Sequence, residues 1–270
     1  MYKFSAATFH ALSQLRLYDI NRPKYRVGNE RDGAYIVVDQ PADTDILSFG
    51  VNNDTSFEEA MAARGHRLFL YDHTIPGCPT DNSAFNFARV GICGGNAPGP
   101  DLMTLEQHMA NIPDLSQRLM LKIDVEGAEW DVFSSIDAKT LARYDQIVAE
   151  FHWFRNLSDP NYANLITKSL EIINSQFTLY HVHANNCAPI LKVDGFFVAD
   201  VIEVSYVRTS LIDRTPSKTV YPSELNKANR PDFYDHALLF YPFLPNSADQ
   251  EQIDAMVRRV SADYQPTPRT

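Results

Sequence analysis

The chain has 270 residues, of which 44% are hydrophobic and 21% are charged, and its formal net charge is −10 at pH 7. This composition is typical of a folded globular protein and excludes a disordered or fibrous chain. Because the acidic excess repels polyanions, we expect no nucleic-acid partner.

The N-terminal part is expected to form a helix followed by a flap. Residues 5–17 carry apolar side chains at helical spacing, which predicts a helix. A turn signal at Asp32 precedes the β-branched strand 35–38, so residues 24–40 are expected to form a hairpin that folds as a flap.

From residue 45 onward, apolar strands alternate with amphipathic helices. We expect strands at residues 46–50, 67–71, 85–92, 119–123, 146–151, 177–182 and 201–207. We expect helices at residues 56–64, 102–110, 130–135 and 162–175, with a further helical turn around Leu141. This alternation predicts an α/β fold with a Rossmann-like, doubly wound, mostly parallel seven-stranded sheet.

The expected organisation is one domain in three consecutive segments. Residues 1–40 form the helix and flap, and residues 41–211 form the core. Residues 212–270 are polar and rich in proline at first, which indicates a lid or long loop, and end in a strand and a helix packed on the same domain.

The first strand-to-helix turn of the core, residues 48–58, is a candidate ligand loop. In doubly wound sheets, ligands bind beyond the carboxyl ends of the strands. Gly50, Asn52 and Asp54 stand where a glycine-rich loop would have its glycines, and Ser56 is a candidate N-cap of the next helix. Because the loop has few glycines, it suits an amino-acid-bearing sulfonium better than a diphosphate, although an ordinary capped turn would have a similar sequence.

Asp72 ends the second core strand, about 20 residues after this loop. Rossmann folds place there an acid that accepts hydrogen bonds from ribose hydroxyls. An aspartate after a strand is also a common turn former, so its meaning depends on the preceding loop.

The fourth core strand runs into three acids around a glycine, in the segment Leu121-Lys-Ile-Asp-Val-Glu-Gly-Ala-Glu-Trp130. Carboxylates so close repel one another unless a cation, a proton or a hydrogen-bonding ligand compensates them. The alternative is a solvated helix start, where the helix dipole favours acids.

This segment resembles the signature of the FkbM-type S-adenosylmethionine-dependent methyltransferases, many of which methylate sugar hydroxyls. Further segments are similar to that family: residues 26–35, 48–58, 71–75 and 150–152. The resemblance implies a class I methyltransferase that binds S-adenosyl-L-methionine, with Asp72 at the ribose and Asp124 and Glu126 at the reacting centre. The residues expected at the donor are Gly50, Asn52, Asp54, Ser56, Phe57, Asp72, His73, Gly91 and Asp124. Ser48 departs from the pattern, because many methyltransferases have an acid before the loop.

Glu150 and His152 alternate on the fifth core strand and therefore share a face. His152 is the preferred general base, because methyl transfer to a hydroxyl requires removal of its proton; a structural histidine is the alternative. Asp124, Glu150 and His152 could instead hold Mg or Mn, which would acidify and orient a diol.

Four further residues are expected to contact the acceptor: Asp32, Tyr35, His181 and His183. The function predicted from these observations is O-methylation of a sugar hydroxyl in a glycan, a polysaccharide precursor or a natural product. Methylation of an amine or phosphoramidate, or a non-catalytic donor-binding module, are the alternatives. A nicotinamide-dependent oxidoreductase would need a glycine-rich diphosphate turn, which the loop does not provide.

Cys78, Cys93 and Cys187 form no C-x-x-C pair, which suits a reducing compartment. No stretch reaches the roughly 18 apolar residues of a membrane span. We therefore expect a cytoplasmic protein with a small-molecule or glycan acceptor, and we allow for a homodimer.

Overall fold

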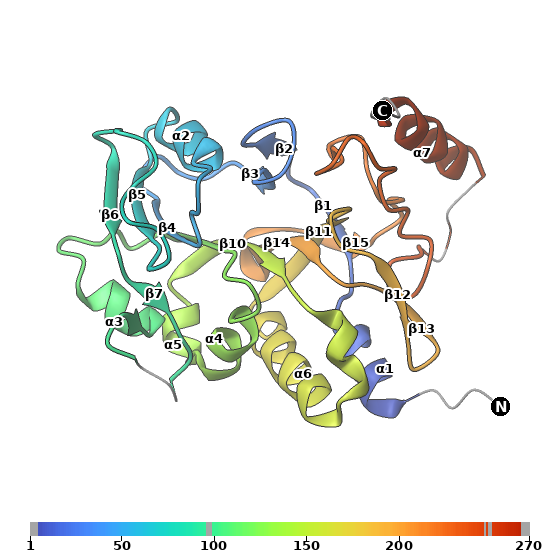
Figure 1. Cartoon of the computed structure of the whole chain (residues 1–270), viewed down its shortest axis with the longest axis horizontal. Helices are drawn as coiled ribbons and strands as arrows, with labels where there is room; N and C mark the ends of the chain where they lie inside the picture. The colour runs from blue at the N-terminus through green and yellow to red at the C-terminus, as the bar shows by residue number, and fades with distance from the viewer. Residues whose placement is uncertain (1–4, 96–98, 246, 248–249, 266–270) are drawn as a thin grey trace.

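The computed structural model describes residues 5–95, 99–245, 247 and 250–265 (Figure 1). Its centre is a seven-stranded sheet with the order β11-β14-β10-β9-β4-β5-β6. In that order the strands are Phe177–Ala184, Ile202–Arg208, Tyr144–Phe151, Leu119–Ile123, Asp45–Phe49, Arg67–Tyr71 and Phe85–Ala88. Only β14 runs antiparallel to its neighbours in this sheet, so the predicted mostly parallel, doubly wound sheet is confirmed.

Helices cover both faces of the sheet (Figure 1). One face carries α1 (Ala6–Ser13), α3 (Leu105–Ala110), α4 (Glu129–Ser135), α5 (Ala138–Leu141) and α6 (Pro160–Asn174). The other carries α2 (Ser56–Ala62) and the hairpin of β2 (Lys24–Val27) and β3 (Tyr35–Val38), which confirms the predicted hairpin.

Alternation along the strands explains this arrangement. In β9, Leu121 packs in the apolar cluster that contains Trp130 of α4, whereas its neighbour Met120 packs with Phe57 of α2. Successive side chains of a strand point to opposite faces. An apolar run without polar interruption therefore requires cover on both sides of the sheet.

The structure differs from the sequence-based elements at the sheet edge. The strand expected at 85–92 is broken after Ala88, where the amide of Val90 turns back to the Ala88 carbonyl. Gly91–Ile92 forms a separate short strand, β7, that pairs with β8 (Leu102–Met103). The helix expected from residue 102 therefore begins only at Leu105.

Two further pairs of strands were not predicted. They are β12 (Ile190–Val193) with β13 (Phe196–Ala199), and β1 (Tyr18–Ile20) with β15 (Arg214–Pro216). The short 3-10 helices are η1 (Phe154–Ser158) and η2 (Thr209–Leu211), and α7 (Gln250–Asp263) is the last described helix. Within the described ranges, no helix is long and apolar enough to cross a membrane.

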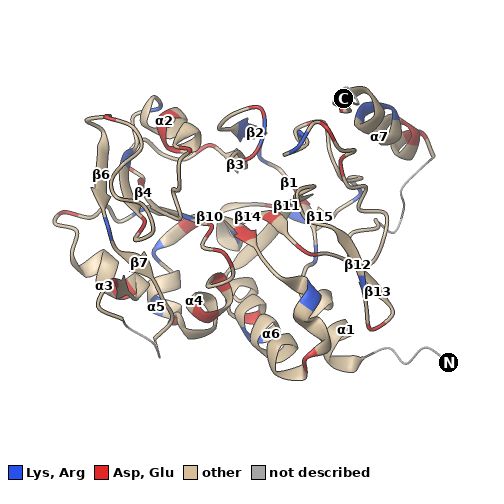
Figure 2. Cartoon of the chain, in the orientation of Figure 1, with Lys and Arg blue, Asp and Glu red and all other residues tan. Residues whose placement is uncertain are grey.

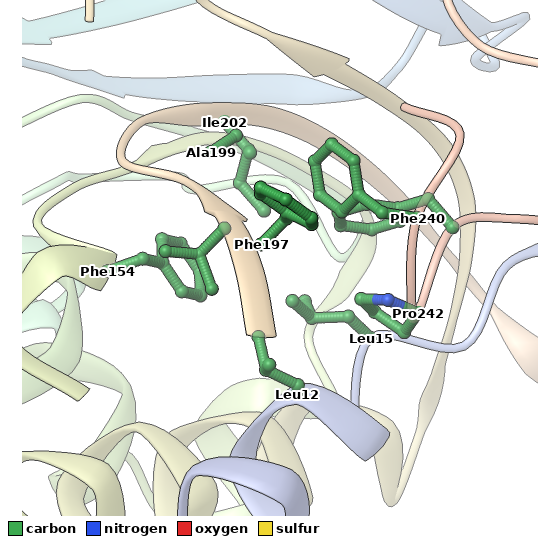
Figure 3. Close-up of a pocket in the computed structure, with 10 residues that line it drawn as sticks. Leu12, Leu15, Phe154, Phe197, Ala199, Ile202, Phe240 and Pro242 are labelled. Atoms are coloured by element: carbon green, nitrogen blue, oxygen red, sulfur yellow. The ribbon is translucent and has the colours of Figure 1, made fainter. Parts of the chain in front are cut away.

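A small apolar cavity lies where α1 meets β13 (Figure 3). Leu12 and Leu15 face Phe197, Phe240 and Pro242 around a space of about 10 Å³. This space has at most the size of one water molecule, so it is a packing gap and holds no substrate.

Candidate active site

A cavity of about 610 Å³ opens at the carboxyl ends of β4, β5, β9 and β10. Seven of the residues expected at the donor line it: Gly50, Asn52, Asp54, Asp72, His73, Gly91 and Asp124. Four residues expected at the reacting centre, the acceptor or the metal also line it: Asp32, Asp124, Glu126 and Glu150. Figure 2 shows acidic residues gathered in the middle of the molecule, around β10 and β14.

Gly50 lets the turn after β4 pass close to β9. Its φ is +77°, and a Cβ atom there would lie 1.5 Å from the carbonyl oxygen of Asp124. The Lys122 ammonium of β9 donates a hydrogen bond of 2.7 Å to the Gly50 carbonyl, which holds the turn against β9. Only glycine combines this conformation with this approach.

Asp72 is buried, and both of its carboxylate oxygens accept hydrogen bonds. Oδ2 accepts from the backbone amide of Asn52 at 2.8 Å, and Oδ1 accepts from the amide and hydroxyl of Thr74. Burial raises the pKa of Asp72, but these hydrogen bonds outweigh it and hold the pKa below its usual value. Asp72 is therefore an ionised acceptor at the edge of the cavity.

The start of α2 differs from the prediction. Its N-cap is Thr55, which makes no side-chain capping bond, so the prediction of Ser56 as N-cap is wrong. Asp54 accepts from the Ser56 amide instead and also from the side chain of Asn29 in the flap. Because the Ser56 hydroxyl accepts from the Asn29 amide, the loop is anchored to the flap. Phe57 packs edge-on against Tyr35 in the core, and neither Ser56 nor Phe57 lines the cavity.

His152 lies among four carboxylates beyond the end of β10. Nδ1 is 3.1 Å from Glu129, and Nε2 is 3.2 Å from Glu150, 3.5 Å from Glu126 and 3.9 Å from Asp124. Burial lowers the pKa of His152, but hydrogen bonds to Glu129 and Glu150 raise it to about 11. The imidazole of His152 therefore keeps its proton at neutral pH. The prediction that His152 is the general base assumed an ordinary histidine pKa near 6.5.

Asp124 and Glu150 are pushed toward their protonated forms. Burial raises the pKa of both carboxyls, and repulsion between Asp124 and Glu150 raises that of Asp124 well above its usual value. The hydroxyl of Tyr35 lies 3.2 Å from Asp124 Oδ2 and donates to it. Oxygen or nitrogen atoms of Asp124, Glu150 and His152 lie within 4.8 Å of one another. The three residues of the predicted metal site are therefore close enough to share one cation.

A sequence-family model described as the methyltransferase FkbM domain matches residues 13–174, which is more than half of the chain. The chain belongs to the FkbM methyltransferase family. It is therefore an S-adenosylmethionine-dependent methyltransferase, and its seven-stranded sheet is that of the class I enzymes.

This FkbM methyltransferase is weakly similar to several solved structures. Fibrillarin in a fibrillarin/Nop5p complex is 8% identical, with 64% of this chain and 76% of that chain covered and a TM-score of 0.36. A predicted O-methyltransferase from Agrobacterium tumefaciens is 14% identical, with 64% and 77% covered and a TM-score of 0.34. Among curated protein sequences, none matches the chain significantly.

His181 and His183 of the FkbM methyltransferase do not line the cavity. His181 is buried and bonds to the Asn226 amide nitrogen, and burial lowers its pKa well below the usual value. His183 lies 3.0 Å from both Glu203 and Asp235. It therefore ties β11 and β14 to the segment that follows β15.

Among the cavity residues that the sequence analysis did not single out are Glu58, Lys122 and Asn229. Glu58 is buried in α2, where it accepts from Ser48 at 2.5 Å and lies 3.8 Å from the Lys122 ammonium. It thus brings a carboxylate next to Ser48, the position at which the expected acid is missing. Glu58 could have been noticed in the sequence as an acid within an apolar helix face. No sequence pattern marks Asn229 as a cavity residue.

Proposed function

We propose that this FkbM methyltransferase transfers the methyl group of S-adenosylmethionine to a hydroxyl group of a sugar, in a glycan, a polysaccharide precursor or a natural product. The observation that carries the proposal is one cavity that joins the Gly50 turn and Asp72 to the acids Asp124 and Glu150. A hydroxyl acceptor needs a proton acceptor beside the methyl donor, whereas a neutral amine does not.

In this proposal the donor lies along the carboxyl ends of β4 and β5. Asp72, ionised and fixed by its hydrogen bonds, accepts from the ribose hydroxyls. The Gly50 turn, Asn52 and Asp54 contact the amino-acid part, and His73 and Gly91 flank the adenine. The positive sulfonium is favoured because acidic side chains dominate this end of the cavity.

Asp124 is the proton acceptor that we favour. Burial and the neighbouring Glu150 raise its pKa, which makes its ionised form a stronger base, and it lines the cavity, whereas His152 holds a proton of its own. In the reaction, the acceptor oxygen forms a bond to the methyl carbon while the carbon–sulfur bond breaks. The hydroxyl proton passes to Asp124, and S-adenosylhomocysteine leaves. Holding both reactants in line contributes up to roughly 7–11 kcal/mol.

A divalent cation, Mg or Mn, held by Asp124, Glu150 and His152 is a second way to activate the hydroxyl. The supporting observation is the contact of His152 Nδ1 with Glu129, an outer carboxylate that would leave Nε2 facing the two acids. When bound, such a cation acidifies and orients a hydroxyl. Loss of methyl transfer in EDTA that returns with Mn²⁺ supports the cation; full activity after exhaustive chelation excludes it.

An exposed indole beside Gly127, which stands between the cavity residues Glu126 and Ala128, supports a sugar acceptor. Trp153 follows His152 directly, is 45% exposed and packs its ring about 3.4 Å from the position of a Cβ on Gly127. Its φ of 65° is rare for a large side chain and costs free energy, which suggests that the position of the ring is selected. Sugar rings stack their C–H faces on such surfaces.

The experiment is methyl transfer from tritiated S-adenosylmethionine to a panel of neutral methyl glycosides, amino sugars and a sugar phosphoramidate. We expect label in an O-methyl ether of a neutral glycoside, and loss of that label in Asp124→Asn. Label confined to nitrogen of an amino sugar or phosphoramidate would replace the proposal with the amine alternative.

A further inference from the structure

We propose that Asp32, Glu150, Glu203 and Asn229 form a second acceptor subsite, which binds a pair of neighbouring hydroxyl groups on an uncharged sugar. This inference rests on the proposed function, since it requires an acceptor at this end of the cavity. It goes beyond that function because it assigns residues and a charge class to the part of the acceptor that does not react.

The acids of this subsite come from three parts of the chain. Glu150 of β10 and Glu203 of β14 face each other in register on adjacent strands, and Asp32 lies in the flap loop between β2 and β3. Carboxylate oxygens of the three lie within 4.8 Å of one another. Glu150 and Glu203 are buried, and both Asp32 and Glu150 line the cavity.

A buried acceptor atom of Asn229 is a second, independent feature that points to a ligand. The residue is 5% exposed and lines the cavity. Its amide nitrogen donates to Asp32 at 2.9 Å and to Glu203 at 2.6 Å, so both N–H groups are used. Its Oδ1 atom is buried and has no hydrogen-bond partner among the described residues. A buried acceptor without a partner is unfavourable, and a hydrogen-bond donor on the ligand would remove this penalty.

Charges around the subsite favour a neutral donor group over a metal ion. Glu203 is compensated by His183 at 3.0 Å, and one Glu150 oxygen accepts from Asn185 at 2.7 Å. Several carboxylate lone pairs are therefore already occupied, and Asn229 offers only an acceptor. Vicinal hydroxyls, which donate hydrogen bonds and bring no charge, match this wall of oxygens. A carboxylate or phosphate on the same sugar edge would be repelled.

Glu150 also belongs to the proposed reacting centre, since its other oxygen lies 3.2 Å from His152. One side chain thus touches both subsites. A hydroxyl bound at Asn229 would therefore place a neighbouring hydroxyl of the same ring near Asp124, and the subsite would select which hydroxyl is methylated.

The test measures binding of neutral methyl glycosides and their methyl uronide counterparts by saturation-transfer NMR, on protein saturated with S-adenosylhomocysteine. We expect at least one neutral glycoside to bind and its uronide to bind at least tenfold more weakly. Asn229→Ala and Glu203→Gln should each weaken the neutral glycoside about 5- to 20-fold. Asn161→Ala, on the exposed side of α6, is the matched control and should have no effect.

The donor site provides the internal standard. Calorimetric affinity for S-adenosylhomocysteine should stay within about threefold of the wild type in all three variants. Uronides that bind as well as neutral glycosides, or variants that bind glycosides like the wild type, would overturn the subsite while O-methylation of glycosides still stands. If no neutral glycoside either binds or accepts methyl, the proposed function fails and the subsite with it.

Discussion

The imidazole Nδ1 of His152 lies 3.1 Å from Oε1 of Glu129, a residue that is fully buried. Glu129 is itself fixed, since its two oxygens accept from the backbone amides of Val125 and Gly127. The acid-rich loop after β9 therefore orients His152, and Nε2 is left facing Glu150. Glu129 could, from the sequence alone, belong to a solvated helix start. In the structure it is buried and contacts His152 of the candidate reacting centre.

Glu129→Gln should lower methyl transfer about 10- to 100-fold, because a neutral amide orients His152 less firmly and no longer balances its charge. Affinity for S-adenosylhomocysteine should stay within about threefold of the wild type. Steady-state kinetics and calorimetry measure the two quantities, with Glu251→Gln on the exposed side of α7 as control. Unchanged turnover in Glu129→Gln would show that the contact between Glu129 and His152 does not affect methyl transfer.

Asp72→Ala should weaken S-adenosylhomocysteine binding roughly 10- to 150-fold, because hydrogen bonds to a charged group contribute about 1.5–3 kcal/mol. The control is Asp81→Asn, an exposed acid in the same stretch after β5. Calorimetric titration decides the matter: equal affinities in wild type and Asp72→Ala would show that the ribose lies elsewhere.

Gly50→Ala should lower the melting temperature at least about twice as much as Gly65→Ala. Both glycines have positive φ, but a Cβ on Gly65 meets nothing within 4 Å, whereas one on Gly50 meets the Asp124 carbonyl. The Gly65 variant therefore isolates the conformational cost, roughly 1–2 kcal/mol, from the steric one. If scanning calorimetry gave similar decreases in melting temperature for Gly50→Ala and Gly65→Ala, the turn after β4 would be able to move away from β9.

Alkaline pH should destabilise the protein through His183. Burial lowers the pKa of His183, but Asp235 and Glu203 raise it to about 10, above the value of about 6.5 in an unfolded chain. A group with a raised folded pKa stabilises fully below pH ~6.5, and this contribution is lost as pH rises toward 10. Melting temperatures between pH 7 and 9.5 should fall less steeply in His183→Gln than in the wild type. Parallel slopes would show that His183 is neutral in the folded protein.

Much of the fold follows from the sequence, because short, mostly apolar strand runs alternate with amphipathic helical segments. β9 and β5 have the expected bounds, because each is a short, mostly apolar run that is followed directly by an aspartate. The β12–β13 hairpin was missed although Asp194 and Gly195, both with positive φ, form the turn that an Asp-Gly pair favours.

The candidate site could be predicted only where it follows strand ends. Asp72 and Asp124 come directly after β5 and β9, and parallel strands place these positions along one edge. Asn229 lies in an irregular segment whose position depends on tertiary contacts with Asp32 and Glu203, so no local pattern marks it. His152 was identified, but its protonation depends on Glu129, which folding brings to its Nδ1 atom.

The most direct test of the account is a structure of the protein with S-adenosylhomocysteine bound. We predict the ribose hydroxyls within hydrogen-bond distance of Asp72 and the sulfur directed toward Asp124 and Glu150. If S-adenosylhomocysteine bound outside this cavity, or with its sulfur pointing away from both acids, the proposed positions of the methyl donor and the methyl acceptor would be wrong.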